Sequence, residues 1–225
     1  MRPVGILGGM GPEATILLMQ KVLNAVPAAD DSDHVPLIVH QNPQVPSRIK
    51  ALIEGTGQDP APALAQMACD LQAAGAQALA MPCNTAHHYA HAVTKACDLA
   101  FLNMLDLTAE TLVGQGARRI GMLASPATRL AGVFDVPFSA SGLTPVWTTD
   151  EDALLRIIQA VKAGQAGAVK DDLRAVADDV LAQGADRLMV ACTELSLLTD
   201  VLPDGVAWTD SLDCLTDGIV AFAQG

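Results

Sequence analysis

Short apolar runs alternate with longer amphipathic segments along the whole chain. The runs are too short for helices and are typical of buried strands, whereas the longer segments repeat apolar residues at helical spacing. The expected strands are residues 3–9, 34–41, 76–83, 100–105, 118–125, 143–148 and 186–192. The expected helices are residues 11–26, 59–75, 87–99, 107–116, 150–164, 170–184 and 211–224. This alternation predicts an α/β fold with parallel sheets that helices cover on both faces.

The first half of this pattern recurs in the second half. Gly75 stands eight residues before Cys83 in GAQALAMPC, and Gly184 stands eight residues before Cys192 in GADRLMVAC. We interpret the recurrence as two similar α/β lobes with a boundary near residues 103–107. Chance similarity between two strand–helix units is the alternative explanation.

Both cysteines follow directly on a predicted buried strand. Parallel α/β sheets bind ligands at the carboxyl ends of their strands, so Cys83 and Cys192 are expected at a ligand site. Polar residues follow each of them, Asn84 and Thr85 in one lobe and Thr193–Glu194 in the other. Cys69, Cys97 and Cys214 lie within helical patterns and are expected to be buried small side chains.

Composition narrows the possible functions. The formal net charge of −12 and the lack of clustered Lys and Arg argue against a nucleic-acid partner. No apolar run reaches the roughly 18 residues of a membrane span, and no secretory signal is visible. Five cysteines without a CxxC pair argue against a disulfide framework or a zinc cluster, so a cytoplasmic protein with reduced thiols is expected. An acidic ligand would need locally placed cations.

A thiol on each side of one cleft suits a particular reaction. One thiolate can remove a proton from carbon while a thiol on the opposite face returns one, which inverts the stereocentre. The ordinary thiol pKa of about 8.5 is close enough to neutrality for a cysteine to serve in either role. The helix or loop starts that follow both cysteines favour the thiolate through their backbone N–H groups.

Four stretches together resemble a known family. GILGGMGPEAT, NPQVPSR, PCNTAH and ACTEL, in this order and spacing, are similar to the cofactor-independent aspartate/glutamate racemases, in particular to their aspartate racemase branch. The resemblance covers nearly the whole chain. It implies two pseudo-symmetric Rossmann-like lobes with the active site in the cleft between them, a small acidic amino-acid substrate, and often a homodimer. It also implies a reaction without pyridoxal phosphate, metal or nicotinamide.

The resemblance assigns roles and lobes. Cys83 and Cys192 would be the catalytic acid/base pair. The lobes would be residues 1–104 and 105–210, and a helix at about 211–225 would pack back on the first lobe. The substrate-binding residues would be Met10, Gly11, Arg48, Asn84, Thr85, Ser125, Thr128, Lys162, Thr193 and Glu194.

Some assignments stay open. The loop SPATR at 125–129 and the stretch 133–152 depart from the family's usual form, which leaves the exact substrate undecided between aspartate, glutamate and another acid. A hydantoin racemase, a maleate isomerase and a non-catalytic module that binds small acids are the alternatives. His87 either shapes the site or is a surface or capping residue. The opening glycines follow G-x-x-G-G-x-G, which argues against dinucleotide binding.

Overall fold

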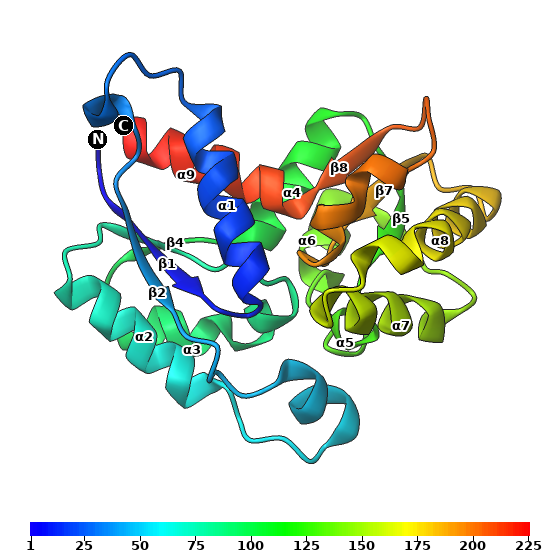
Figure 1. Cartoon of the computed structure of the whole chain (residues 1–225), viewed down its shortest axis with the longest axis horizontal. Helices are drawn as coiled ribbons and strands as arrows, with labels where there is room; N and C mark the ends of the chain where they lie inside the picture. Colours follow the sequence, from blue (N-terminus) through cyan, green and yellow to red (C-terminus); the bar gives the residue numbers. More distant parts are fainter.

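Two four-stranded parallel sheets form the centres of two lobes that lie side by side in the computed structural model (Figure 1). The structure describes residues 1–225, apart from the side chain of Glu151. The strand orders are β2-β1-β3-β4 and β6-β5-β7-β8, so the two sheets have the same topology. The predicted α/β fold with two parallel-sheet lobes is confirmed.

The first sheet and its helices come from the first half of the chain together with its last helix. The strands are β1 (Val4–Gly8), β2 (Leu37–Gln41), β3 (Ala78–Ala80) and β4 (Ala100–Leu102). The helices are α1 (Pro12–Ala25), α2 (Ala61–Ala73), α3 (Ala90–Ala96) and α9 (Ser211–Gln224), whereas α4 (Met104–Gly114) connects the lobes and packs mainly against the second sheet. Shorter turns are a π-helical one at Lys50–Glu54 and 3₁₀ ones at Asp31–Asp33 and Thr85–Tyr89.

The second sheet follows the same plan. Its strands are β5 (Arg119–Leu123), β6 (Thr144–Val146), β7 (Arg187–Val190) and β8 (Trp208–Asp210). Its helices are α5 (Pro126–Leu130), α6 (Asp135–Ser141), α7 (Glu151–Lys162) and α8 (Lys170–Ala182), with 3₁₀ turns at Ala166–Val169 and Leu195–Val201.

The central strands are apolar throughout because both of their faces are covered. On β1, Leu7 packs in a cluster with α2, whereas Val4 and Ile6 pack in another cluster with α1 and α9. All five residues of β1 are buried. A strand buried on both faces loses the alternation of apolar and polar residues that a half-exposed strand shows.

Gly5 and Gly121 occupy equivalent positions in the two lobes. A Cβ atom on Gly5 would lie 2.9 Å from the Cβ of Ala76, and one on Gly121 would lie 3.1 Å from the Cβ of Ala185. Both distances are shorter than ordinary van der Waals contact. The recurring glycine therefore lets the neighbouring strand and helix approach the central strand closely in each lobe.

The chain crosses between the lobes twice. Helix α4 leads from β4 in the first sheet to β5 in the second, and α9 leads from β8 back onto the first sheet, where it packs against α1 and α4. In Figure 1 α9 runs from the centre of the molecule across the first lobe, and the two chain ends lie close together on the first lobe. The backbone N–H of Arg2 donates to the carbonyl of Ala223 at 2.9 Å.

The structure adds elements that the sequence pattern did not indicate. Strand β8 and the short helices α5 and α6 were not expected, because their segments show neither a continuous apolar run nor a helical repeat of apolar residues. None of the helices in the described part of the chain combines the length and apolar character of a membrane span.

Candidate active site

A polar cavity lies between the lobes where the parallel strands end. It contains about 430 Å³ of space not filled by atoms, part of it open to solvent. The segments that follow β1, β2 and β3 form one wall, and those that follow β5 and β7, together with α7, form the other. Its lining residues are Met10, Ser47, Arg48, Ile49, Cys83, Asn84, Thr85, Ser125, Ile158, Lys162, Ala191, Cys192, Thr193 and Glu194.

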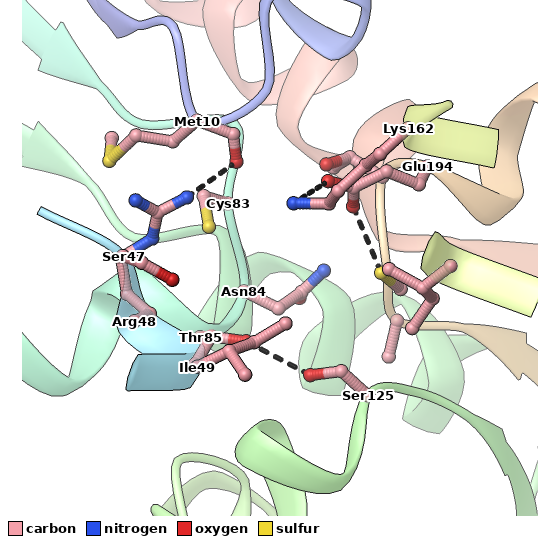
Figure 2. Close-up of a pocket in the computed structure, with 14 residues that line it drawn as sticks. Met10, Ser47, Arg48, Ile49, Cys83, Asn84, Thr85, Ser125, Lys162 and Glu194 are labelled. Carbon is pink, nitrogen blue, oxygen red and sulfur yellow. Dashed lines mark hydrogen bonds and ion pairs between the residues drawn. The ribbon is translucent and has the colours of Figure 1, made fainter. Parts of the chain in front are cut away.

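Arg48 is fixed on the first wall by backbone carbonyls. Its Nη1 donates to Pro46 O at 3.0 Å, and its Nη2 donates to Met10 O at 3.3 Å (Figure 2). The Nε atom is buried and has no hydrogen-bond partner among the described residues. A guanidinium cannot lose its proton in a protein, and Arg48 lines the cavity, so its side chain is suited to an anion there.

Cys83 lies on the same wall, three residues after the end of β3. Its backbone N–H donates to Met81 O at 2.8 Å, which closes a tight turn at Pro82. Figure 2 places its sulfur between Arg48 and Asn84, and the residue is 8% exposed. The thiol is therefore positioned at the cavity surface and largely shielded from water.

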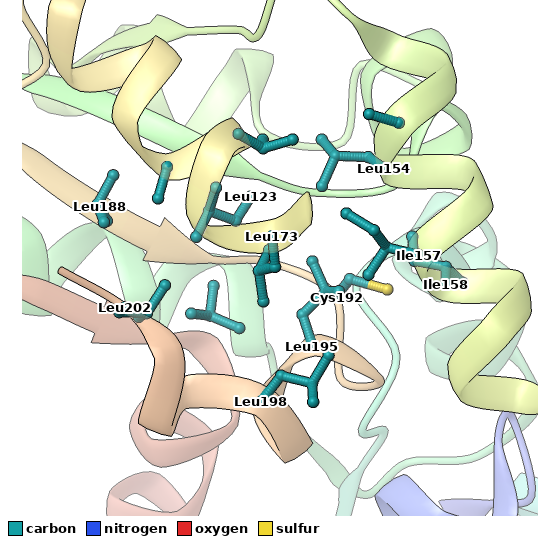
Figure 3. Close-up of a cluster of buried hydrophobic side chains, with 14 of the residues drawn as sticks. Leu123, Leu154, Ile157, Ile158, Leu173, Leu188, Cys192, Leu195, Leu198 and Leu202 are labelled. Carbon is teal, nitrogen blue, oxygen red and sulfur yellow. The ribbon is translucent and has the colours of Figure 1, made fainter. Parts of the chain in front are cut away.

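The second wall carries a chain of three linked side chains. The thiol of Cys192 donates to Glu194 Oε2 at 3.0 Å, and Lys162 Nζ lies 2.9 Å from Glu194 Oε1 (Figure 2). Lys162 reaches the cavity from α7 one helical turn after Ile158, and both side chains line it. Cys192 also belongs to the apolar core of the second lobe, beside Ile157 (Figure 3).

The surroundings determine the protonation states of the three linked side chains, Cys192, Glu194 and Lys162. Burial and the Glu194 carboxylate raise the pKa of the Cys192 thiol well above its ordinary value. Burial opposes ionisation of Glu194, but the Lys162 ammonium and the Cys192 hydrogen bond outweigh it and lower the pKa of Glu194. Burial likewise opposes the charge on Lys162, yet the Glu194 carboxylate beside it raises the pKa of Lys162 overall. The result is a neutral thiol, a carboxylate and an ammonium in series.

Three hydroxyl groups join the two lobes beside the cavity. Thr85 of the first lobe lies 2.8 Å from Thr128 and 3.3 Å from Ser125, both of the second lobe. Ser125 also caps α5 by accepting from the Thr128 N–H. Nearby, Asn84 Nδ2 donates to Ser211 Oγ at 2.9 Å. All of these side chains are buried, and the lobes meet here through hydrogen-bonded hydroxyl groups, whereas the Oδ1 atom of Asn84 is buried without a partner among the described residues.

The predicted site residues are brought together with two exceptions. Gly11 and Thr128 do not line the cavity: Gly11 lies next to it, near Glu194, and Thr128 lies behind Thr85. Sequence reasoning missed Ser47, Ile49, Ile158 and Ala191. Ser47 and Ile49 flank Arg48 and were open to inference from it, whereas Ile158 was recognisable only from its place one turn before Lys162. Ala191 precedes Cys192 directly.

The described residues contain no group of three His, Cys, Asp or Glu side chains that would hold a metal ion. The cavity instead presents two thiols, one guanidinium, one ammonium–carboxylate pair and several hydroxyl and amide groups. These groups suit a small molecule that carries carboxylates.

Fold and site together define a two-lobed isomerase of the amino-acid racemase type. The chain belongs to the Asp/Glu/hydantoin racemase family, whose model matches residues 7–218.

Individual relatives agree with this placement. The chain is similar to the aspartate racemase of Picrophilus torridus, with a TM-score of 0.90 and 28% identity over 100% of this chain and 95% of the other. It is 24% identical to the broad specificity amino-acid racemase RacX of Bacillus subtilis, over 97% of this chain and 96% of that protein. A glutamate racemase of Francisella tularensis shares the fold, with a TM-score of 0.67 at 14% identity over 98% of this chain and 80% of the other.

Proposed function

We propose that this racemase inverts the Cα centre of a small acidic amino acid, aspartate foremost, by moving protons between Cys83 and Cys192. The observation that carries the proposal is that two thiols, one from each lobe, line a single cavity. The aspartate racemase of Picrophilus torridus supports the choice of substrate.

The reaction needs one base and one acid on opposite faces of Cα. A thiolate takes the Cα proton, so the C–H bond breaks and its electron pair stays on carbon. The opposite thiol then donates its proton to that carbon and becomes the thiolate. The number of protons and the total charge are unchanged by the reaction. The enzyme ends with the two cysteines in exchanged protonation states, which suits it to accept the other enantiomer.

Cys192 begins as the proton donor. Its thiol donates to the Glu194 carboxylate, and its raised pKa keeps it protonated in the free protein. Cys83 is then the base in the first turnover. Cys192 becomes the thiolate, and so the base for the reverse direction, when it gives its proton to Cα, and the Lys162 ammonium favours that charge.

Two cationic side chains, Arg48 and Lys162, suit the two carboxylates of an acidic amino acid. Arg48 lines the cavity with a permanently charged guanidinium, which suits one carboxylate of the ligand. Lys162 is half-exposed at the mouth, with 42% of its side chain accessible, and suits the second. Local cations of this kind offset the net charge of −12, which otherwise repels an anion.

The α-carboxylate is expected to bind the polar groups between the lobes. Thr85 from the first lobe and Ser125 and Thr193 from the second supply hydroxyls along the cavity, and Asn84 adds an amide. A carboxylate held there by hydrogen bonds also takes up part of the negative charge that develops when Cα loses its proton.

Removal of either thiol tests the mechanism. Cys83→Ala and Cys192→Ala are each expected to lower racemisation of aspartate by about 10²–10⁴-fold or more, because each deletes one of the two proton-transfer groups. Cys69→Ala is the matched control, since Cys69 lies outside the cavity on α2, where it is exposed and not buried as the sequence pattern had indicated.

Chiral chromatography in D₂O provides the measurement. Every product molecule of the wild-type enzyme should carry deuterium at Cα, because its new proton comes from a thiol that exchanges with solvent. Inversion without deuterium would overturn the proposed mechanism. A panel of aspartate, glutamate, neutral amino acids and hydantoins decides the substrate, since a preference for neutral amino acids would contradict the roles of Arg48 and Lys162.

A further inference from the structure

His87 is enclosed by protein directly behind Cys83. The residue is 6% exposed and lies in the 3₁₀ turn Thr85–Tyr89. Its Nδ1 is 2.9 Å from the carbonyl oxygen of Cys83, and its Nε2 accepts the backbone N–H of Met104 at 3.2 Å. A carbonyl can only accept and a backbone N–H can only donate. The ring is therefore neutral, with its proton on Nδ1.

The surroundings keep the ring in this form. Burial lowers the pKa of His87 to about 4, although the hydrogen bond to Cys83 works in the opposite direction. The Phe101 ring packs against it with the centroids 5.4 Å apart. A second proton on Nε2 would point at the N–H of Met104 and cost that hydrogen bond. At neutral pH the imidazole is a fixed connector with one donor and one acceptor.

The two groups that this connector joins are separate parts of the site. One is the backbone of Cys83, whose N–H is already held by Met81 O at 2.8 Å, so that His87 completes the anchoring of both backbone polar groups. The other is Met104, the first residue of α4, the helix that crosses to the second lobe. The direction of the Cys83 side chain thus depends on where α4 begins.

The other cysteine is anchored without a side chain. The carbonyl of Cys192 accepts the backbone N–H of Leu195 at 2.8 Å. Four residues after Cys192, where His87 stands four residues after Cys83, the chain has Ser196, whose hydroxyl donates to Asp210 instead. The imidazole connector therefore belongs to only one of the two half-sites.

We propose that His87 is a positioning residue for Cys83: by bridging the Cys83 carbonyl and the Met104 N–H, it sets the thiol at the distance and angle that proton transfer at one face of Cα requires. The inference rests on the proposed function. Because only one face is involved, loss of the bridge slows proton transfer at Cys83 and leaves proton transfer at Cys192 intact.

His87→Leu and His87→Asn form the first test. Leucine fills the space without hydrogen bonding, whereas the asparagine side-chain N–H replaces Nδ1–H and can still donate to the Cys83 carbonyl. His87→Leu is expected to lower kcat by about 10–100-fold, the usual effect of a small misplacement of a reacting group, and His87→Asn to recover most of that loss.

Substrate isotope effects distinguish positioning from general damage. With Cα-deuterated substrate, slow transfer at Cys83 raises the isotope effect on kcat/KM for the enantiomer whose Cα–H faces Cys83. For the other enantiomer the first step becomes reversible, and the isotope effect falls towards the equilibrium isotope effect of that step. A purely structural loss lowers both rates and leaves the ratio of the two isotope effects at the wild-type value.

Met104→Pro gives an independent test on the other end of the bridge. Proline removes the N–H that holds His87 Nε2, and it is well tolerated at the first position of a helix. The preceding residue, Asn103, has φ −73° and ψ 107°, which proline permits. Met104→Ala removes the same side chain and keeps the N–H, so it controls for lost packing. The isotope-effect ratio should change in Met104→Pro and keep its wild-type value in Met104→Ala.

The outcomes separate this inference from the proposed function. A wild-type enzyme that racemises no member of the panel contradicts the proposed function. A wild-type enzyme that racemises, together with His87→Leu and Met104→Pro proteins whose isotope-effect ratios equal the wild-type value, overturns the role of His87. If His87→Leu does not fold, the Met104 pair decides alone.

Discussion

At the scale of single residues, the two thiols of the site have different partners. Cys192 donates to a carboxylate that an ammonium stabilises, whereas Cys83 lies across the cavity near a guanidinium. Glu194 and Lys162 therefore act on Cys192 with opposite sign, Glu194 favouring the thiol and Lys162 the thiolate. A site with such unequal halves can still catalyse both directions, because each turnover exchanges the roles of the two sulfurs.

Glu194→Gln and Lys162→Met should move the pKa of Cys192 in opposite directions. Glu194→Gln removes a negative charge beside the thiol and lowers its pKa, whereas Lys162→Met removes a positive charge and raises it. The thiolate's ultraviolet absorbance, followed against pH in a Cys83→Ser background, provides the measurement.

The matched blank for that titration is the protein with both Cys83→Ser and Cys192→Ser, which retains the absorbance of Cys69, Cys97 and Cys214. Shifts of the same sign in the two variants would contradict the linked chain of Cys192, Glu194 and Lys162.

At the scale of elements, helix α9 begins at a buried carboxyl group, that of Asp210. Asp210 caps this helix by accepting the Leu212 N–H at 2.8 Å, and it also accepts the Ser196 hydroxyl at 3.0 Å. Its Oδ2 atom is buried with no partner among the described residues. Burial raises the pKa of Asp210 to about 6, although both hydrogen bonds oppose this.

Asp210→Asn should therefore change how stability depends on pH. The folded protein holds the Asp210 proton more tightly than the unfolded chain, so the Asp210 carboxyl lowers the free energy of unfolding as pH rises from about 4 to about 6. Asparagine cannot titrate, so the variant should gain about 3 kcal/mol relative to wild type over that range. Chemical denaturation at a series of pH values measures the difference.

The comparison of Asp210→Asn with wild type isolates the titration of Asp210. His87 acts in the opposite sense, since its pKa of about 4 destabilises the fold as pH falls below about 6.5, but it is present in both proteins and cancels. Asp178→Asn, on the exposed surface of α8, is the control. Stability curves for Asp210→Asn and wild type that run parallel across pH would show that burial of Asp210 costs nothing.

Elements with a strong pattern were predictable from the sequence, and short or contact-dependent ones were not. The strands before Cys83 and Cys192 were recognisable because burial on both faces produces continuous apolar runs. Strand β8 reads as WTD, and only its pairing with β7 makes it a strand.

In the site, too, some features were predictable from the sequence and others depend on contacts between distant elements. The residues at strand ends follow from the fold class, and their chemistry is visible in the sequence. The ion pair of Lys162 with Glu194 was not predictable, because it joins α7 to the segment after β7. The connection of His87 to Met104 likewise depends on how α4 leaves the first lobe. Contacts between distant elements have no local sequence signature.

At the scale of the whole molecule, two chain crossings and shared polar contacts join the lobes. Helices α4 and α9 pack on each other and on elements of both halves. Two such connections favour a single cooperative unfolding transition over separate melting of each lobe.

Leu18→Ala tests this coupling. Leu18 is fully buried in the first lobe, so its truncation should cost about 2–5 kcal/mol of unfolding free energy. Both tryptophans of the chain, Trp147 and Trp208, lie in the second lobe. If the lobes unfold together, tryptophan fluorescence should report the same loss as circular dichroism.

Ile16→Ala is the control on the same helix, because Ile16 is 60% exposed and its truncation should change stability by less than about 0.5 kcal/mol. A tryptophan transition that stays at the wild-type denaturant concentration in Leu18→Ala would mean that the lobes unfold independently.

The hydrogen bond between Arg2 and Ala223 makes the polypeptide nearly a closed ring. A short linker would join its ends, and new ends could be opened at the exposed turn around Gly164, beyond α7. In such a circularly permuted protein the new ends divide the second lobe, while α4 and α9, the two connections between the lobes, both survive. The two walls of the cavity are therefore expected to keep their relative placement in the permuted protein.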